Sequence, residues 1–115
     1  MAYKNNLITG ITELLILSIL EKQDSYVYEI TKTISDRSNG LLSISHNTIY
    51  TAAYKLEETN MISEYSKLVG KKRTRVYYHL EPEGKEHLKK ISEDYSKMTK
   101  GVTSILNSLT GDIMN

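Results

Sequence analysis

The sequence predicts a mainly α-helical protein with one small β-hairpin, completed by a long C-terminal helix. Apolar residues recur at helical spacing in three stretches before residue 61, and they alternate at every second position over 62–80. Beyond Pro82 an apolar stripe at heptad spacing runs through residues 88–109. The expected order is therefore helix, helix, helix, hairpin, helix, with residues 1–80 as one domain and residues 81–115 as an appended helix.

Composition limits the kind of protein before any element is considered. The 115 residues suffice for one modest core, and the absence of Cys excludes a disulfide framework or a thiolate metal site. The most apolar stretch, 14–20, is far shorter than the ~20 residues of a membrane span. We therefore expect a cytoplasmic protein that has no membrane segment.

The formal net charge of +1 conceals an uneven distribution. Residues 1–45 carry four basic and five acidic side chains, and residues 81–115 carry five basic and six acidic ones. Residues 46–80 carry six basic and three acidic side chains, a local net charge of +3. The positive charge is therefore concentrated in the third helix and the hairpin.

The first helix is expected over about residues 9–22, with Thr9 as its cap. The apolar run at 14–20 is also compatible with a buried strand, but the longer register Ile8–Ile11–Leu15–Ile19 favours a helix. A second helix should follow Gln23–Ser25, which have N-cap chemistry, and should end at 38–40. Residues 42–44 alternate in polarity and predict one short strand.

Ser45 is the expected N-cap of a third helix that ends near Asn60. At 100° per residue the helix has a small apolar face and an opposite face that is polar and mostly uncharged. The apolar face consists of Ile49, Ala52, Ala53 and Leu56, and the polar face consists of Asn47, Thr51, Tyr54 and Glu58, flanked by Tyr50 and Lys55.

Residues 62–69 and 73–80 alternate and predict two strands joined by residues 70–72. The hairpin concentrates basic side chains, which can be either a nucleic-acid contact or simply a solvated loop. Five of them fall within nine residues that contain no acid: Lys67, Lys71, Lys72, Arg73 and Arg75.

The last helix should begin at Pro82 and end near Gly111, which can serve as its C-cap. Its stripe at steps of three and four residues predicts a dimer seam, although the same stripe could instead pack inside the subunit against the first helix. The predicted dimer interface contains Ile8, Ile11, Leu15, Leu88, Ile91, Tyr95, Met98, Val102, Ile105 and Leu109.

This element order with a basic hairpin is the layout of a winged helix-turn-helix. Its third helix would enter the major groove, with Asn47 and Thr51 facing base edges, while the hairpin, or wing, would lie along phosphates. The residues predicted on this basis to contact DNA are Ser45, Asn47, Tyr50, Thr51, Tyr54, Lys55, Lys71, Lys72, Arg73 and Arg75.

Catalysis is not expected. The chain has three His and no Cys, and its six glycines are isolated, so it has no phosphate-binding loop. Glu83 and His87 have the spacing of a helical metal pair, but no third ligand is evident in the sequence. We therefore predict neither an enzyme nor a bound cofactor or metal.

Several short stretches, in this order and spacing, resemble the PadR family of transcriptional regulators, of the short type with a single C-terminal helix. The resemblance covers about residues 8–109. Departures include Thr51 where many members have Pro and Lys55 where Arg is common. The matching stretches are residues 13–17, 26–30, 38–40, 47–50, 55–57, 70–73, 77–80 and 82–84.

The resemblance implies a bacterial homodimer, usually a repressor, whose C-terminal helix exchanges contacts with the first helix of its partner. It implies DNA contacts at Thr48, Tyr50 and Lys55 of the third helix, and at 71–73 of the wing. Some members sense phenolic acids or flat apolar drugs between the subunits, where Tyr95 and Met98 would lie.

The expected function is a dimeric, sequence-specific DNA-binding repressor that a small apolar or aromatic effector releases from double-stranded promoter DNA. The alternative is a winged-helix protein-interaction module that does not bind DNA. The two differ in whether the basic hairpin and the exposed face of the third helix lie on one surface.

Overall fold

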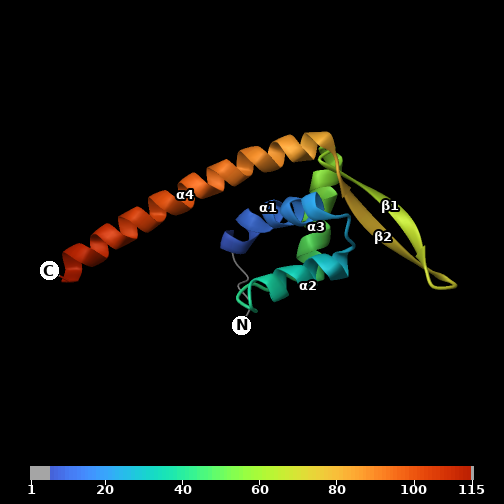
Figure 1. Cartoon of the computed structure of the whole chain (residues 1–115), viewed down its shortest axis with the longest axis horizontal. Helices are drawn as coiled ribbons and strands as arrows, with labels where there is room; N and C mark the ends of the chain where they lie inside the picture. Colours follow the sequence, from blue (N-terminus) through green and yellow to red (C-terminus); the bar gives the residue numbers. More distant parts are fainter. Residues whose placement is uncertain (1–5, 115) are drawn as a thin grey trace.

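A computed structural model describes residues 6–114 of the chain and has the predicted order of elements (Figure 1). The chain is mainly helical, with a single antiparallel two-stranded hairpin in the described part. The elements are α1 (Asn6–Lys22), α2 (Val27–Arg37), α3 (His46–Glu58), β1 (Ile62–Val69), β2 (Arg73–Leu80) and α4 (Pro82–Met114).

Helix α1 is the centre of the core and contacts α2, α3, α4 and β2. Ile16 and Leu17 are fully buried within it, which explains why the helix is apolar on nearly all sides. The buried Thr12 of this helix donates its hydroxyl to the carbonyl oxygen of Ile8 at 2.7 Å, so this side chain leaves no unsatisfied group in the core. The expectation of a buried first helix is therefore confirmed, although the helix begins at Asn6 and Thr9 lies inside it.

The N-cap of α2 differs from the prediction. Tyr26 occupies that position, and its backbone N–H donates to Glu29 Oε1 at 3.4 Å. Ser25 is instead used by the hairpin, because its N–H donates to Tyr78 and its carbonyl oxygen accepts from the Tyr78 N–H at 2.9 Å. Ser25 is thus part of a strand contact rather than a helix cap.

The predicted strand at residues 42–44 is wrong, because the segment between α2 and α3 has no strand partner. Asn39 and Gly40 both adopt positive φ angles, 53° and 78°, and reverse the chain after α2. The Ser38 side chain then accepts the N–H of Leu42 at 2.9 Å. Ile44 is buried without forming a strand, so its apolar character reflects core packing alone.

The hairpin is anchored at its base and exposed towards its tip. Its register runs from Ile62 opposite Leu80 to Val69 opposite Arg73, as the alternation predicts. Ile62, Tyr78 and Leu80 are buried against the helices, whereas the half nearer the tip stands clear of them. Gly70 closes the turn with a φ of 72°.

Helix α4 packs only at its beginning. Leu88 is buried and Ile91 is partly buried against the core, but beyond Ile91 nearly every side chain through residue 110 is exposed. The hairpin and the far end of α4 point away from the helical core in opposite directions (Figure 1). Helix α4 continues past Gly111 to Met114, so Gly111 is not the predicted C-cap. In residues 6–114, no helix is both long and apolar enough to span a membrane.

Replacing Gly84 by Ala should destabilise the fold by about 3 kcal/mol, because no space exists for a methyl group. A Cβ there would overlap the carbonyl oxygen of Met61 and lie 2.7 Å from Leu80 Cδ1. The Met61 oxygen cannot retreat freely, since it accepts the Glu81 N–H at 3.0 Å. Chemical denaturation of both proteins measures the difference in the free energy of unfolding.

Gly101 provides the matched control, because it lies in the same helix and a Cβ there meets nothing within 4 Å. Gly101→Ala should leave stability unchanged or raise it by up to about 1 kcal/mol. Equal stability of the Gly84→Ala variant and the wild type would show that the junction between β2 and α4 is looser than the structure indicates.

Candidate nucleic-acid interface

The exposed face of α3 has the residues that the sequence predicted. Ile49, Ala52, Ala53 and Leu56 are buried, and Asn47, Tyr50, Thr51, Tyr54 and Lys55 are exposed. Lys55 and Glu58 are the charged residues of this exposed face, and the rest of its outer surface presents mainly amide and hydroxyl groups. Such groups can donate to and accept from base edges and phosphates.

Some polar side chains of this face are engaged in hydrogen bonds within α3 and its N-cap. Ser45 accepts the Thr48 N–H at 3.2 Å and its hydroxyl lies 3.0 Å from the Thr48 hydroxyl, so both side chains organise the start of α3. Thr51 donates its hydroxyl to the carbonyl oxygen of Asn47 at 2.9 Å. The Thr51 oxygen therefore remains available as an acceptor, and the Asn47 amide retains both donor and acceptor capacity.

The predicted residues of α3 divide between two clefts. Asn47, Thr48, Thr51 and Lys55 border a cleft of about 340 Å³ against α1, where Glu13 lies opposite them. Tyr50 and Tyr54 border a larger cleft of about 950 Å³ between α2, α3 and the hairpin. The exposed surface of α3 thus forms the ridge between the two clefts.

The hairpin tip is fully exposed and basic. Lys71, Lys72 and Arg73 lie at the turn, and all three side chains are exposed. Lys67 and Arg75 are directly opposed across the strands, a like-charge pair that would normally destabilise a hairpin. Aromatic rings offset this cost, since the Lys67 ammonium lies 5.3 Å from the Tyr77 ring and the Arg75 guanidinium lies 4.4 Å from the Tyr26 ring.

Four tyrosines form a continuous aromatic row from α2 to the hairpin, which the sequence analysis missed. The Tyr26 ring stacks on Tyr28 at 6.5 Å and meets Tyr77 edge-on at 5.3 Å, and Tyr77 stacks on Tyr65 at 5.7 Å. Tyr65 and Tyr77 are cross-strand partners, so the hairpin alternation could have revealed that pair. The contact to α2 is long-range and had no local signal.

Asp24 connects the hairpin to the loop before α2. It accepts the Tyr65 hydroxyl at 2.7 Å through Oδ2 and contacts His79 Nδ1 at 2.8 Å through Oδ1. Partial burial alone would raise the pKa of Asp24, but the two hydrogen bonds and the charge of His79 outweigh it and hold the pKa below its usual value. The ionised carboxylate therefore holds the outer face of the hairpin against the helical domain.

Asp24→Asn should lower the free energy of unfolding by about 1 kcal/mol at neutral pH, because the variant loses a charge-assisted acceptor. A carboxyl group whose pKa is lower in the folded state stabilises it above the unfolded pKa, and this contribution disappears as the pH falls. Urea denaturation at about pH 7 and about pH 3 should therefore show a difference only at the higher pH.

Asp36→Asn is the control for this comparison. Asp36 pairs with Lys32 at 2.8 Å on the exposed side of α2, where an ion pair contributes little. An equal effect of the two substitutions at pH 7 would contradict a specific role for Asp24 in holding the hairpin.

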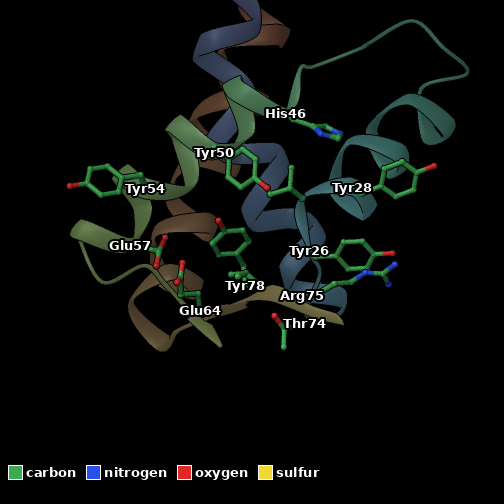
Figure 2. Close-up of a pocket in the computed structure, with 12 residues that line it drawn as sticks. Tyr26, Tyr28, His46, Tyr50, Tyr54, Glu57, Glu64, Thr74, Arg75 and Tyr78 are labelled. Atoms are coloured by element: carbon green, nitrogen blue, oxygen red, sulfur yellow. The ribbon is translucent and has the colours of Figure 1, made fainter. Parts of the chain in front are cut away.

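The larger cleft has an acidic edge where α3 meets the hairpin. Figure 2 shows the Glu57 carboxyl of α3 and the Glu64 carboxyl of β1 pointing toward one another, beside the buried Tyr78. Burial, followed by the hydrogen bond and charge of Glu64, raises the pKa of Glu57 to about 7. Burial and the same two carboxyl groups raise the pKa of Tyr78 to about 12, so this phenol stays protonated.

The predicted dimer stripe divides into two parts. Ile8 and Leu88 are buried in the chain's own core, and Ile11, Leu15 and Ile91 pack against that core. The remaining members have exposed side chains: Tyr95, Met98, Val102, Ile105 and Leu109. The intramolecular alternative therefore describes the beginning of the stripe, while its second half is uncovered.

A long apolar groove continues from this uncovered half of α4 to α1. It has a volume of about 900 Å³, with Ile11 and Leu14 on one wall and Tyr95, Met98 and Val102 on the other. Tyr95 and Met98, the predicted effector residues, thus line the same groove. Glu83 and His87 have no third partner, since no cluster of three possible metal ligands occurs among the described residues.

The packed three-helix core, the exposed polar ridge of α3 and the basic hairpin define a winged helix-turn-helix, a class of DNA-binding fold. The family model described as "Transcriptional regulator PadR-like family" matches residues 16–90, which span α1 to the first turns of α4. The chain belongs to this family. Because the family consists of transcriptional regulators, the expectation that the chain is not an enzyme is confirmed.

Solved structures support the same assignment over nearly the whole chain. A transcriptional regulator from Clostridium thermocellum is 32% identical, with a TM-score of 0.80 over 90% of this chain and 97% of that one. A PadR family transcription regulator from Clostridium difficile R20291 is 33% identical, with a TM-score of 0.74 over 84% and 99% of the two chains. A protein from Streptococcus mutans UA159 is 33% identical, with a TM-score of 0.76 over 93% and 94%. The matches extend into α4, so the long helix is part of the shared fold.

Proposed function

We propose that the protein is a cytoplasmic homodimeric repressor that binds promoter DNA and occludes it. In this proposal residues 1–80 form the DNA-binding unit and residues 81–115 form the dimerisation helix. The observation that carries the proposal is a shared surface: Tyr50 and Tyr54 of α3 and Thr74 and Arg75 of the hairpin border one cleft. That arrangement favours DNA binding over a protein-interaction module, in which the hairpin would only be solvated.

In the proposed complex α3 lies in the major groove and the hairpin lies on the neighbouring backbone or minor groove. Asn47 and Thr51 read base edges, Lys55 and the α3 tyrosines contact the flanking phosphates, and 71–73 neutralise phosphates beyond them. Few phosphates are neutralised by each subunit of a chain with net charge +1. Specific affinity therefore requires two subunits acting together on one site.

The dimer is proposed to form through the uncovered half of α4. Its occupant would be a second copy, because the exposed stripe and the apolar groove lie side by side on one chain and complement each other. A two-fold pairing would insert the α4 stripe of each subunit into the groove between α1 and α4 of the other. This pairing would cover an apolar surface that is unusually continuous for a monomer.

Binding to DNA from upstream of its own gene tests the function. The wild-type protein should retard this duplex in an electrophoretic assay, and a specific competitor should displace it at much lower concentration than a random duplex of equal length. Equal competition by both duplexes, or no retardation at low salt, would favour the protein-interaction alternative.

The effector is proposed to be a small apolar or aromatic molecule that binds beside Tyr95 and Met98. Both side chains line the apolar groove, and a ligand there would alter how two α4 helices pack. A screen should find compounds that weaken binding to the upstream duplex in the wild type but not in a Met98→Gln variant. A screen in which no compound changes the affinity would contradict effector release.

A further inference from the structure

The cleft between α3 and the hairpin lies where a DNA backbone would pass if these two elements occupied adjacent grooves. The inference rests on the proposed function, in which α3 occupies a major groove and the hairpin reaches the adjacent minor groove. One sugar–phosphate strand separates any major groove from the next minor groove. That strand must pass between α3 and the hairpin, directly over the cleft.

The walls of the cleft suit a phosphate strand. The Tyr50 side chain of α3 points towards the centre of the cleft, whereas Tyr54 points away from it (Figure 2). On the opposite wall lie Tyr28 of α2, with 57% of its surface exposed, and Arg75 of β2. His46, at the start of α3, contacts the Thr31 hydroxyl at 3.2 Å and completes this rim. Phenol, imidazole and guanidinium groups can all donate hydrogen bonds to phosphate oxygens.

The acidic edge of the same cleft presents a difficulty for this strand. Glu57 comes from α3 and Glu64 comes from β1, so each of the two DNA-binding elements brings one carboxyl group to their junction. Two ionised carboxylates would repel a phosphate passing above them. The two carboxyl groups face one another across the junction (Figure 2), however, and two like charges brought together in this way favour the state in which one of the groups holds a proton.

We propose that the cleft seats the sugar–phosphate strand between the two grooves, and that the Glu57–Glu64 pair binds one proton when the strand is seated. With that proton the pair has one negative charge rather than two. The pair is then a proton-dependent element of the DNA-binding surface, and Tyr28 and His46 are additional strand contacts on its rim. DNA binding should accordingly be coupled to proton uptake.

The surroundings of the pair contain few other groups that titrate near neutral pH. Tyr78 beneath it remains a neutral donor, because its pKa is about 12. Arg75 of β2 stays cationic and is held over the Tyr26 ring, and the phenols of Tyr50 and Tyr54 border α3. Tyr28 is the phenol that α2 contributes. His46 also borders the cleft, so any test must separate its contribution from that of the pair.

The test measures affinity for the upstream duplex by fluorescence anisotropy from about pH 6 to about pH 8 at constant ionic strength. The wild-type dissociation constant should rise by about 3- to 10-fold, because the second carboxylate ionises over this range. Glu57→Gln removes the carboxyl group whose pKa is raised, so most of the rise should be lost. Glu64→Gln removes the neighbouring charge and leaves only the effect of burial on Glu57, so the rise should become smaller. The double variant should bind more tightly than either single variant at every pH.

Glu58→Gln is the matched control, because Glu58 is exposed on the same end of α3 and lies outside the pair. It removes one negative charge but should keep the wild-type pH dependence. All of these variants retain the three histidines, so the difference in slope between wild type and Glu64→Gln reports the pair alone. Thermal unfolding of each variant checks that its fold is intact.

Tyr28→Phe tests the position of the strand separately. Loss of this hydroxyl should weaken binding to specific and random duplexes alike by about 2- to 10-fold, as expected for a backbone contact. Equal pH slopes in wild type and Glu64→Gln would overturn the proton-binding role of the pair. An unchanged DNA affinity of Tyr28→Phe would overturn the proposed position of the sugar–phosphate strand in the cleft. Absence of DNA binding at every pH would instead refute the proposed function itself.

Discussion

Replacing Met98 and Val102 together by Glu should convert the proposed dimer into a monomer and lower its affinity for promoter DNA by about 100-fold or more. Both side chains are about half exposed in the single chain, at 56% and 49%, so the substitutions should leave the subunit folded. In a two-fold interface they would bury four carboxylates among apolar side chains, at a cost of several kcal/mol. The loss of DNA affinity follows because each monomer retains only half of the contacts.

Sedimentation velocity at micromolar concentration measures the first effect. The wild type should have about twice the chain mass of 13.1 kDa, and the double variant should have the mass of one chain. The control is Ser96→Glu with Asn107→Glu, which adds the same charge to exposed positions on the opposite side of α4. A double variant that remains dimeric would show that the exposed stripe is not the seam.

The elements whose signals are local could be predicted from the sequence. The four buried residues of α3 follow from a period of 3.6, and the register from Ile62–Leu80 to Val69–Arg73 follows from alternation around a glycine turn. Pro82 marked the start of α4, because its fixed φ and missing N–H suit the first helical position. Each of these signals lies within one turn or one strand.

Boundaries set by distant residues could not be predicted in this way. Ser25 looked like a helix cap because its side chain has cap chemistry, but its backbone pairs with Tyr78 across the domain. Asp24 lies 41 positions from Tyr65 and 55 from His79, so no local pattern connects them. The tertiary contact overrode the local preference in both cases.

The sequence predicts which residues belong to the candidate site better than it predicts how those residues are arranged in space. The sequence identified the exposed face of α3, but the division of its residues between two clefts depends on where α1 and the hairpin pack. Glu57 and Glu64 are seven positions apart in two different elements, and only the fold brings their carboxyl groups together. The heptad stripe predicts either a dimer seam or a contact inside the subunit, whereas packing against α1 covers only its first turns and leaves the rest exposed.

Replacing Lys72 and Arg73 together by Ala should weaken promoter binding by about 10- to 100-fold at low salt and reduce its salt dependence. Both side chains are exposed at the hairpin tip, which extends away from the helical core (Figure 1). If each contacts one phosphate, a dimer loses four contacts, and the slope of log Kobs against log salt should become shallower by about 3.6. Specificity between duplexes should change little, because phosphate contacts do not read bases.

Lys89→Ala with Lys90→Ala is the matched control, since both side chains are exposed on α4 and the variant has the same total charge. Anisotropy titrations at a series of salt concentrations should give the wild-type slope for this control and a shallower slope for the hairpin variant. Equal slopes for the two variants would mean that net charge alone accounts for the salt dependence. A shallower slope only in the hairpin variant requires that the wing lies on the phosphates, because the two variants differ only in where the charge is removed.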